Sequence, residues 1–242
     1  MFESRFRSGF SGRAIHDWSA FYAEMAAQAS HPALKRFYQA GVPSGRTPLE
    51  EVPLVAMDFE TTGLDANQCD IVSIGLVPMS LQRIRHRDAR HWIVRPRSDL
   101  SHESVVIHGI THSVVDGAPD LTQQLDQLLE QLQGCVVVAH CCSIERQFLD
   151  RALRERLGEG IRFPMLDTMR IEAQVSRPDG LLGRLFGIGK VSLRLADCRA
   201  RYHLPFYHPH HAQTDALACA ELLQAQIAHH YSPKLAVDNL WC

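Results

Sequence analysis

The sequence PLVAMDFETTGLD at residues 53–65 joins a predicted buried strand to an acidic turn. Its first five residues form an apolar run of the length and composition typical of a buried strand. Side chains two positions apart on a strand point to the same face, so Asp58 and Glu60 project together. Two like charges beside a buried strand require compensation, and hard divalent cations such as Mg²⁺ or Mn²⁺ supply it because they prefer oxygen ligands.

The residues around this strand alternate between apolar runs of strand length and helical patterns. Residues 71–77 and 83–94 predict two further strands, and the three together suggest antiparallel neighbours at the start of a sheet. Apolar residues then recur on one helix face from residue 120 until Gly134 supplies a stop. The other predicted elements are strands at 136–139 and 164–168 and helices at 143–157, 192–202 and 212–230. Strands first, then alternating helices and strands, predict an α/β domain with a mixed sheet covered by helices.

Two later segments each place an acid near a histidine. Glu145 lies in the first turns of the predicted helix at 143–157, five residues after His140. Asp215 begins the last helix, five residues after His210. An imidazole with its ordinary pKa of about 6.5 suits a general base near neutral pH, and an acid on the adjoining helix can reach a metal. Each segment alone is equally typical of a solvated charge at a helix N-terminus.

The DxE pair, the histidine-led helix with an acid, and the HxxxxD segment occur in the same order as the motifs of the DnaQ-like (DEDDh) 3′-5′ exonucleases. The chain resembles this family, which includes the proofreading epsilon subunit of bacterial DNA polymerase III, over roughly residues 53–228. Softer matches are His108-Gly-Ile-Thr111 and Asp167-Thr-Met-Arg170. The resemblance implies a ribonuclease H-like fold with a mixed five-stranded sheet flanked by helices.

The chain departs from the family pattern in the second motif. The family normally has Asn after the motif histidine and Asp at the acidic position, where this chain has Cys141 and Glu145. Glu keeps the negative charge but adds a methylene group, so the ion that it helps to hold can shift. This change motivates a hypothesis from another class, a non-catalytic nucleic-acid-binding or polymerase-associated subunit on the same fold. The presence of all four acids and of His210 argues against this alternative.

The resemblance implies a metal-dependent hydrolase with two divalent cations, Mg²⁺ or Mn²⁺, bound by Asp58, Glu60, Glu145 and Asp215. His210 would act as general base; His211 is the neighbouring rival, but only His210 stands five residues before Asp215. The substrate would be a single-stranded or frayed 3′ end of DNA or RNA, and the product a nucleoside 5′-monophosphate. The resemblance also implies that the terminal nucleotide is bound by Thr61, Thr62, Gly63, Leu64 and His108.

Other parts of the chain flank the predicted exonuclease domain, which we assign to residues 51–232. Residues 1–50 carry two helical patterns before a Pro- and Gly-rich break at 43–48, which predicts a helical N-terminal extension. This extension either packs on the core as a stabilising arm or contacts a polymerase or a second copy of the chain. Residues 233–242 are interpreted as a C-terminal tail.

The composition of the 242 residues indicates a globular protein, because 45% of them are apolar and 21% are charged. The net charge of −2 excludes a strongly basic, non-specific nucleic-acid coat. The seven cysteines include no CxxC pair, which indicates neither a disulfide framework nor a structural zinc site. No apolar stretch approaches the roughly 20 residues that span a bilayer, and the N-terminus lacks a secretory signal pattern. We therefore expect a cytoplasmic protein without membrane contact.

Three further segments carry weaker signals. Six arginines between residues 83 and 97 either guide nucleic acid or line an exposed strand face. Residues 177–190 either touch a substrate backbone or form an insertion; they are no phosphate loop, because GxxxxGK[ST] would require Gly at Arg184 and a hydroxyl at Val191. The histidines at 203–211 lack the partner ligands of a zinc site at recognisable spacing.

Overall fold

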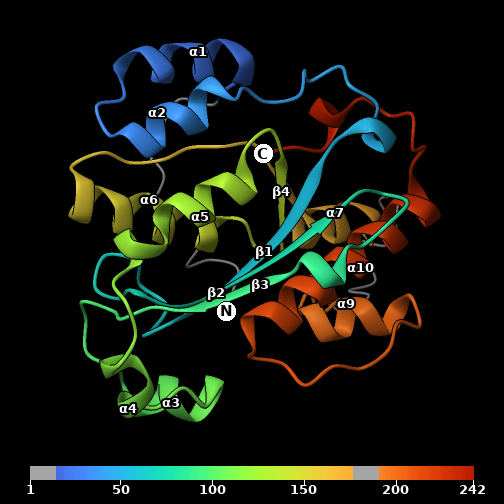
Figure 1. Cartoon of the computed structure of the whole chain (residues 1–242). Helices are drawn as coiled ribbons and strands as arrows, with labels where there is room; N and C mark the ends of the chain where they lie inside the picture. The colour runs from blue at the N-terminus through green and yellow to red at the C-terminus, as the bar shows by residue number, and fades with distance from the viewer. Residues whose placement is uncertain (1–14, 177–190) are drawn as a thin grey trace, which may run out of the picture.

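The computed structural model describes residues 15–176 and 191–242. Its centre is a sheet of five strands, β1 (Leu54–Thr61), β2 (Ile71–Met79), β3 (Arg90–Ile93), β4 (Val136–Ala139) and β5 (Met165–Asp167). They lie in the order β3-β2-β1-β4-β5 (Figure 1). β2 is antiparallel to β1 and β3, whereas β4 is parallel to β1 and β5 is parallel to β4. The mixed five-stranded α/β sheet expected from the sequence is confirmed.

Helices cover both faces of this sheet (Figure 1). On one side lie α1 (Trp18–Gln28), α2 (Pro32–Gln39), α5 (Leu121–Leu132) and α6 (Ser143–Leu157). On the other side lie α7 (Thr168–Val175), α9 (Leu195–Arg201) and α10 (Ala212–His230). The short helices α3 (His102–His108) and α4 (His112–Asp116) pack against Val72 of β2. Single 3-10 turns are η1 (Leu49–Glu51), η2 (His86–Asp88) and η3 (Val237–Asn239).

The alternation of side chains along β1 divides them between two apolar cores. Val55 and Met57 belong to the core that includes residues of α5 and α6, whereas Leu54 and Ala56 belong to the core that includes α10. Continued by the same period of two, the pattern places Asp58 and Glu60 on the α10 face. Burial of the strand therefore delivers both acids to the space beneath α10.

Three predicted elements differ from those observed. The strand expected at 83–94 contains only the four residues of β3, and Ile84 makes no more than an isolated bridge to Met79. Exposed arginines without apolar alternation leave this edge little to bury. The helix expected at 192–202 begins later, at Leu195. The strand expected at 164–168 ends at Asp167, because the carboxylate of this residue caps α7.

The two N-terminal helices pack on the core. Trp18, Phe37 and Tyr38 are buried and share a core with α5 and α6. The backbone N–H groups of Ser30 and His31 donate to the carboxylate of Glu159 at 3.0 and 2.8 Å. This packing is what a stabilising arm requires. Residues 1–14 of the predicted extension, and the predicted loop 177–190, lie outside the described residues.

The C-terminal segment 233–242 also folds back onto the core. The N–H of Leu49 donates to the carbonyl of Leu235 at 2.9 Å, and the N–H of Cys242 donates to the carbonyl of Met165 at 2.8 Å. Val237 is fully buried. These bonds connect the C-terminal segment to η1 and to β5.

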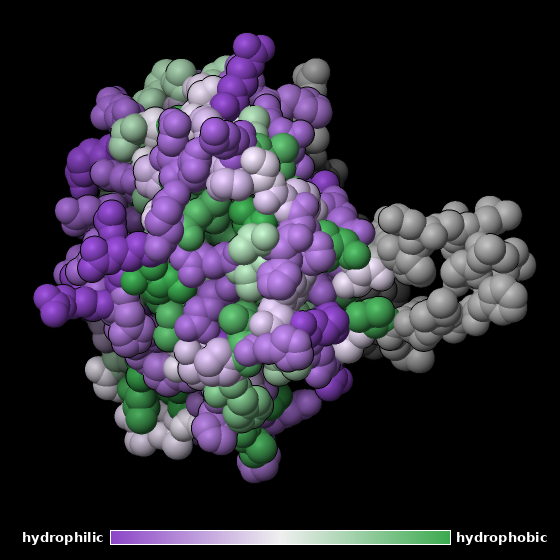
Figure 2. Space-filling view, turned by 90° about the vertical axis from the view of Figure 1, so that its right-hand side faces the viewer, coloured by the Kyte–Doolittle hydropathy of each residue, from purple (hydrophilic) through white to green (hydrophobic). Residues whose placement is uncertain are grey.

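The outer surface is predominantly polar. In the view of Figure 2, hydrophilic residues cover most of the face, and apolar residues lie between them in small patches. Within the described ranges, the longest and most apolar helices still fall short of what is needed to cross a bilayer.

Candidate active site

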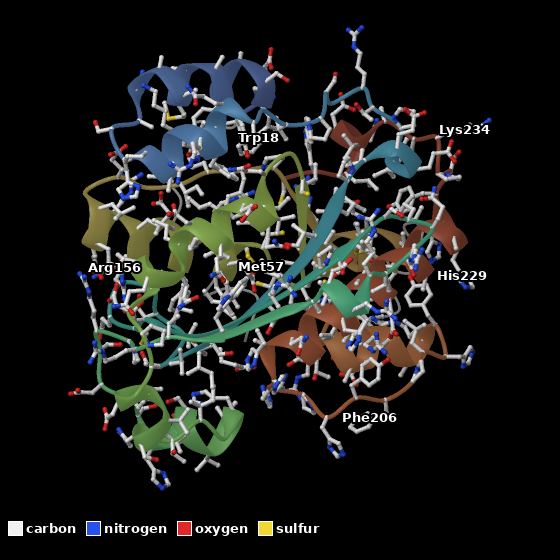
Figure 3. The ribbon with its side chains drawn as sticks, viewed as in Figure 1. Trp18, Met57, Arg156, Phe206, His229 and Lys234 are labelled. Atoms are coloured by element: carbon white, nitrogen blue, oxygen red, sulfur yellow. The ribbon has the colours of Figure 1, made fainter. Side chains whose placement is uncertain are left out.

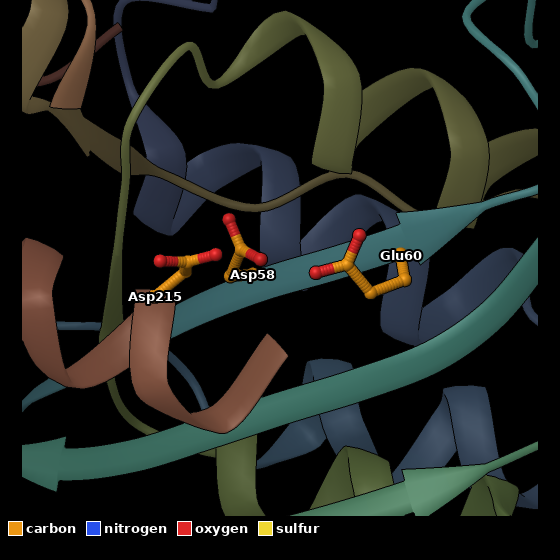
Figure 4. A group of neighbouring side chains, drawn as sticks. All are labelled: Asp58, Glu60 and Asp215. Atoms are coloured by element: carbon orange, nitrogen blue, oxygen red, sulfur yellow. The ribbon is translucent and has the colours of Figure 1, made fainter. Parts of the chain in front are cut away.

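Three carboxyl groups meet beneath the start of α10. Asp58 and Glu60 come from β1 and Asp215 from the first turn of α10, and each offers an oxygen within 4.8 Å of the other two. The carboxyl group of Asp58 lies between those of Asp215 and Glu60 (Figure 4). Oxygen atoms at this spacing fit around a hard divalent cation. The fold thus brings three of the four predicted metal ligands together.

A glycine in β2 allows α10 to approach the sheet. Gly75 pairs with Asp58 across the β1–β2 ladder, and a Cβ atom at Gly75 would overlap the backbone of Ala212. Ala212 is the first residue of α10, so Gly75 determines how closely Asp215 comes to β1. Gly75 was not among the predicted site residues, although a glycine inside an apolar strand is a signal of close backbone approach.

The loop before α10 ties His210 to Asp215. The backbone N–H of His210 donates to Oδ2 of Asp215 at 2.6 Å, and His210 has a φ of +70°, which is uncommon for a residue other than glycine. Its side chain is exposed, and its charge is among the causes that lower the pKa of Asp215 against the effect of burial. His211 is engaged elsewhere, because its ring caps α10 through Thr214 and lies 4.6 Å from the ring of His91.

Glu145 lies close to the three acids without joining their group. It is only 2% exposed, and its Oε2 has no hydrogen-bond partner among the described residues. Burial, assisted by repulsion from Asp167, raises its pKa well above the ordinary value. Repulsion from Glu145 is in turn the largest cause after burial that raises the pKa of Asp58. An unpaired buried oxygen beside another acid is an arrangement that a cation would relieve.

Burial has the largest effect on the pKa of each of these acids. It raises the pKa of Glu60 to about 8, with repulsion from Asp215 as the second cause. The pKa values of Asp58 and Asp215 are also raised, in both cases first by burial. In the part of the chain that the structure describes, no Lys or Arg forms an ion pair with any of the four acids. The donor set and its electrostatics therefore fit divalent metal ions.

A fifth carboxylate organises the second motif. Asp167 accepts hydrogen bonds at 3.0–3.2 Å from four backbone N–H groups, those of Cys141, Cys142, Met169 and Arg170. Two of these groups belong to the turn that opens α6, where Cys141 has a φ of +81°, and two belong to the start of α7. Asp167 therefore holds the turn that carries Glu145 toward the site. The sequence had marked it only as a family match, and its role as a cap was missed because the helix that follows it, α7, was not predicted.

The residues expected to bind a terminal nucleotide have different surroundings. Both polar groups of Thr62 are engaged within the fold, its N–H with the carbonyl of Asp70 at 3.0 Å and its hydroxyl with Ser98 at 2.7 Å. The hydroxyl of Thr61 donates to the carbonyl of Gly63 at 2.7 Å. These bonds stiffen the turn that follows Glu60.

Two of the expected substrate contacts keep a surface or donor for a ligand. Leu64, at the tip of the same turn, is 62% exposed. In His108, Nδ1 accepts from the N–H of Ile110 at 3.0 Å, so Nε2 carries the proton. This Nε2 is buried and has no hydrogen-bond partner among the described residues.

A family model for exonucleases, RNase_T, matches residues 55–223. The matched range contains the four acids and His210. The chain belongs to this exonuclease family. The membership confirms the resemblance inferred from the three motifs and identifies the protein as an exonuclease by family.

Curated relatives include subunits and domains of bacterial replicative polymerases. The DNA polymerase III subunit epsilon of Treponema pallidum is 28% identical over 181 residues, which cover 75% of this chain and 79% of that protein. The PolC-type DNA polymerase III of Thermotoga petrophila is 30% identical over 122 residues, which cover 50% of this chain. That match spans only 9% of the polymerase.

Solved structures of exonucleases share the fold. Exonuclease X in complex with 5′ overhanging duplex DNA superposes with a TM-score of 0.58 at 21% identity, over 76% of this chain and 98% of that one. The nuclease domain of 3′hExo, a DEDDh family member bound to rAMP, gives a TM-score of 0.59 at 16% identity, over 74% and 92% of the two chains. These similarities confirm the expected ribonuclease H-like architecture.

Proposed function

We propose that this protein is a metal-dependent 3′-5′ exonuclease that releases nucleoside 5′-monophosphates from the 3′ ends of DNA or RNA. The observation that carries the proposal is the partly buried acidic cluster of Asp58, Glu60 and Asp215, in which no acid forms an ion pair with a Lys or Arg of the described chain. Membership of the exonuclease family supplies the reaction class. The direction follows the structural relatives, one of which is a 3′-exonuclease that recognises the 3′ end of a histone mRNA stem-loop.

The acids would hold two divalent cations, Mg²⁺ or Mn²⁺. Asp58, Glu60 and Asp215 would hold one ion, and Asp58 with Glu145 would hold the other, which would give the unpaired Oε2 of Glu145 a partner. Divalent ions bound there would lower the pKa of an attacking water and stabilise the leaving 3′-oxygen. Because Glu60 has a pKa of about 8, its carboxyl must lose a proton when it becomes a ligand near neutral pH.

His210 is our candidate for the general base. Its backbone is fixed to Asp215 by the 2.6 Å hydrogen bond, so the imidazole stands beside the acidic cluster. The side chain is exposed and can exchange a proton with solvent after each turnover. His211, in contrast, is held by its contacts with His91 and Thr214.

The terminal nucleotide would bind at the turn after Glu60. The backbone of Thr61, Thr62 and Gly63 forms this turn, Leu64 offers an exposed apolar side chain, and His108 offers an unpaired Nε2–H donor. Related structures contain a 5′ overhanging duplex DNA and a ribonucleotide, which supports both DNA and RNA ends as substrates. A single-stranded or frayed end is the form that a chain-end enzyme can thread into such a turn.

The cellular setting is part of the same proposal. Polymerase III relatives support association with a polymerase, and the N-terminal extension offers a surface for a polymerase or for a second copy of this chain. The seven cysteines are free thiols, which fits a reducing cytoplasm.

The experiment uses the full chain and oligonucleotides labelled at the 5′ end. Single-stranded DNA, duplex DNA and short RNA, each with a free or a blocked 3′ end, are incubated with Mg²⁺, Mn²⁺ or EDTA. The proposal expects stepwise shortening that requires metal and a free 3′ end. A non-catalytic binding subunit would shift the mobility of the oligonucleotide without shortening it, and this result would contradict the proposal.

A further inference from the structure

An open hollow lies beside Asp215, and none of the proposed catalytic steps uses it. It has a volume of about 440 Å³, counting the solvent space at its mouth. Its walls come from α9, from the loop between α9 and α10, and from the first turns of α10, and they include Leu195, Leu204 and Phe206. Because Asp215 also belongs to the acidic cluster, the hollow and the cluster share a wall.

Phe206 provides an exposed aromatic face at this hollow. The residue is 72% exposed and lies at the outer edge of the loop next to α9 (Figure 3). Among the described residues, its ring contact is edge-on, with His208 at a centroid distance of 5.6 Å. An edge-on contact leaves ring surface for a flat partner to stack on.

The loop that carries Phe206 is anchored on both sides. The buried guanidinium of Arg199 donates to a carbonyl of α10 at 2.6 Å, to the carbonyl of Pro205 at 2.8 Å and to the carboxylate of Glu221 at 2.7 Å. It also lies 4.6 Å from the ring centroid of Tyr207, whose hydroxyl donates to Glu221 at 3.0 Å. Both neighbours of Phe206 are therefore anchored, Pro205 to Arg199 of α9 and Tyr207 to Glu221 of α10, so the backbone that carries the aromatic ring is held in place.

The lining selects an uncharged flat group. Arg199 is the one cation among the lining residues, and both terminal nitrogens of its guanidinium donate hydrogen bonds within the fold. The other lining residues are Ala, Leu, Pro and aromatic residues, apart from Asp215, which repels anions. A phosphate group finds no partner there, whereas a nucleobase has an apolar face that stacks on aromatic rings irrespective of its identity.

The order of the acids assigns the hollow to one base. Asp58 lies between Glu60 and Asp215 (Figure 4), and the turn from Thr61 to Leu64 continues from the Glu60 end. A scissile phosphate above Asp58, with the terminal nucleotide on that turn, places the preceding nucleotide at the Asp215 end. The hollow lies at this end, because Asp215 is part of its wall.

We propose that the hollow beside Asp215 is a second base subsite, which holds the base on the 5′ side of the scissile phosphate stacked on Phe206. This inference rests on the proposed exonuclease function and adds the second subsite to it. The subsite binds without regard to base identity, and it gives the enzyme a requirement for a base in the penultimate position.

The test compares intact DNA tetranucleotides with tetranucleotides that carry an abasic residue at the terminal, penultimate or third position. For the wild-type chain, loss of the penultimate base is expected to raise KM by roughly 5- to 150-fold. Phe206→Ala should raise KM for the intact oligonucleotide by a similar factor. It should raise KM little further for the oligonucleotide that lacks the penultimate base. Phe206→Trp should restore most of the loss. Val114→Ala removes an exposed apolar side chain from α4 and should change KM less than twofold.

Two results would overturn the subsite. One is an equal effect of Phe206→Ala on the intact and the penultimate-abasic oligonucleotides, and the other is no effect on either. Shortening of all oligonucleotides without a penultimate effect rejects the subsite but keeps the exonuclease. If the wild-type chain shortens none of the oligonucleotides, the exonuclease proposal fails. The same variants and oligonucleotides are then compared by fluorescence anisotropy in Ca²⁺. In that measurement, Phe206→Ala must weaken binding only when the penultimate base is present.

Discussion

The helix α10 adjoins two groups of buried carboxylates whose surroundings are opposite. Glu172 of α7 is 1% exposed and accepts hydrogen bonds at 2.8–2.9 Å from Ser176, Arg201, Tyr202 and Gln226. Burial alone would raise its pKa, but these hydrogen bonds outweigh burial and lower it. At the other group, burial raises the pKa values of Asp58, Glu60 and Asp215, and repulsion from neighbouring acids adds to the rise for Asp58 and Glu60.

The difference separates a structural acid from a functional one. Every oxygen of Glu172 is paired, so the fold gains from keeping the charge. The cluster around Asp58 costs the folded protein stability in the absence of metal, because like charges are buried together. A protein can keep such a destabilising cluster when a bound ligand compensates the charges. The absence of ion-pair partners therefore identifies the site more sharply than the presence of acids alone.

The largest effect is expected from removing one charge of the unpaired group. Asp58→Asn should lower the turnover number on the order of 10³-fold or more, because a divalent ion loses its central ligand. The same variant in EDTA should unfold at an equal or higher temperature than the wild type, since repulsion has been relieved. Mononucleotide release and thermal unfolding measure the two effects. A folded variant with a tenth or more of the wild-type turnover would remove the comparison.

The neighbouring histidines sharpen the same site. His210→Gln should lower the turnover number by about 10²-fold or more, in the range of general-base catalysis. His211→Gln serves as the matched control and should retain most of the turnover, because its ring is held against His91. Steady-state kinetics on a 5′-labelled oligonucleotide compares them. Equal losses, or a larger loss in the control, would reject His210 as the base.

Glu172 should respond in the opposite way to Asp58. Glu172→Ala removes hydrogen bonds to a charged acceptor, and we expect the free energy of unfolding to fall by roughly 2–3 kcal/mol. Turnover per folded molecule should stay near the wild-type value at a temperature where the variant is folded. Urea unfolding and active-site-normalised rates check both parts. Unchanged stability would show that paired and unpaired acids do not differ as argued.

The pH dependence of stability follows from the raised pKa of Glu60. Its carboxyl has a pKa of about 8 when folded against 4.5 ordinarily, so folding favours the protonated form. This contribution is fully present below pH 4.5 and is lost as the pH rises toward 8. The metal-free protein in EDTA should therefore lose stability across this window, by about 1.4 kcal/mol for each pH unit. Glu60→Gln should flatten the slope in urea unfolding series, and an unaltered slope would contradict the assignment.

The smallest effect is expected at the position that departs from the family pattern. Glu145→Asp keeps the charge and shortens the side chain by one methylene, so turnover should stay within about tenfold of wild type. Rates in Mg²⁺ and Mn²⁺ measure it, with Glu145→Gln as the charge-free control that should lose far more. A folded but inactive Asp variant would mean that Glu145 has been given the wrong role.

The parts of the site that the sequence predicted are those with a local pattern. The helix of Asp215 and the start of the strand before Asp58 were placed within a residue or two, because burial on strand and helix periods determines them, whereas the strand continues through the expected acidic turn to Thr61. The spacing of His210 to Asp215 came from motif resemblance. The periodicity of each strand or helix is sufficient to predict the first two of these features.

The parts that were missed depend on contacts between distant elements. Gly75 matters only because α10 crosses β2 there, and Asp167 matters because the turns after β4 and β5 meet. The strand at 83–94 was predicted to be too long, because exposed arginines at a sheet edge have little apolar surface to bury by pairing with the next strand. The spacing of residues within one segment carries no information on such contacts between distant elements.

Titration of the wild-type chain and Asp58→Asn with Mn²⁺ at pH 7, by calorimetry in buffers of different ionisation enthalpy, tests the central claim most directly. The account predicts that the wild-type chain binds Mn²⁺ and releases protons, because Glu60 with a pKa of about 8 is protonated before metal binds. Asp58→Asn should remain folded and bind Mn²⁺ at least tenfold more weakly. Equal Mn²⁺ binding by both chains, or binding without proton release, would contradict the claim that these acids, which form no ion pair with Lys or Arg in the described chain, are a metal site.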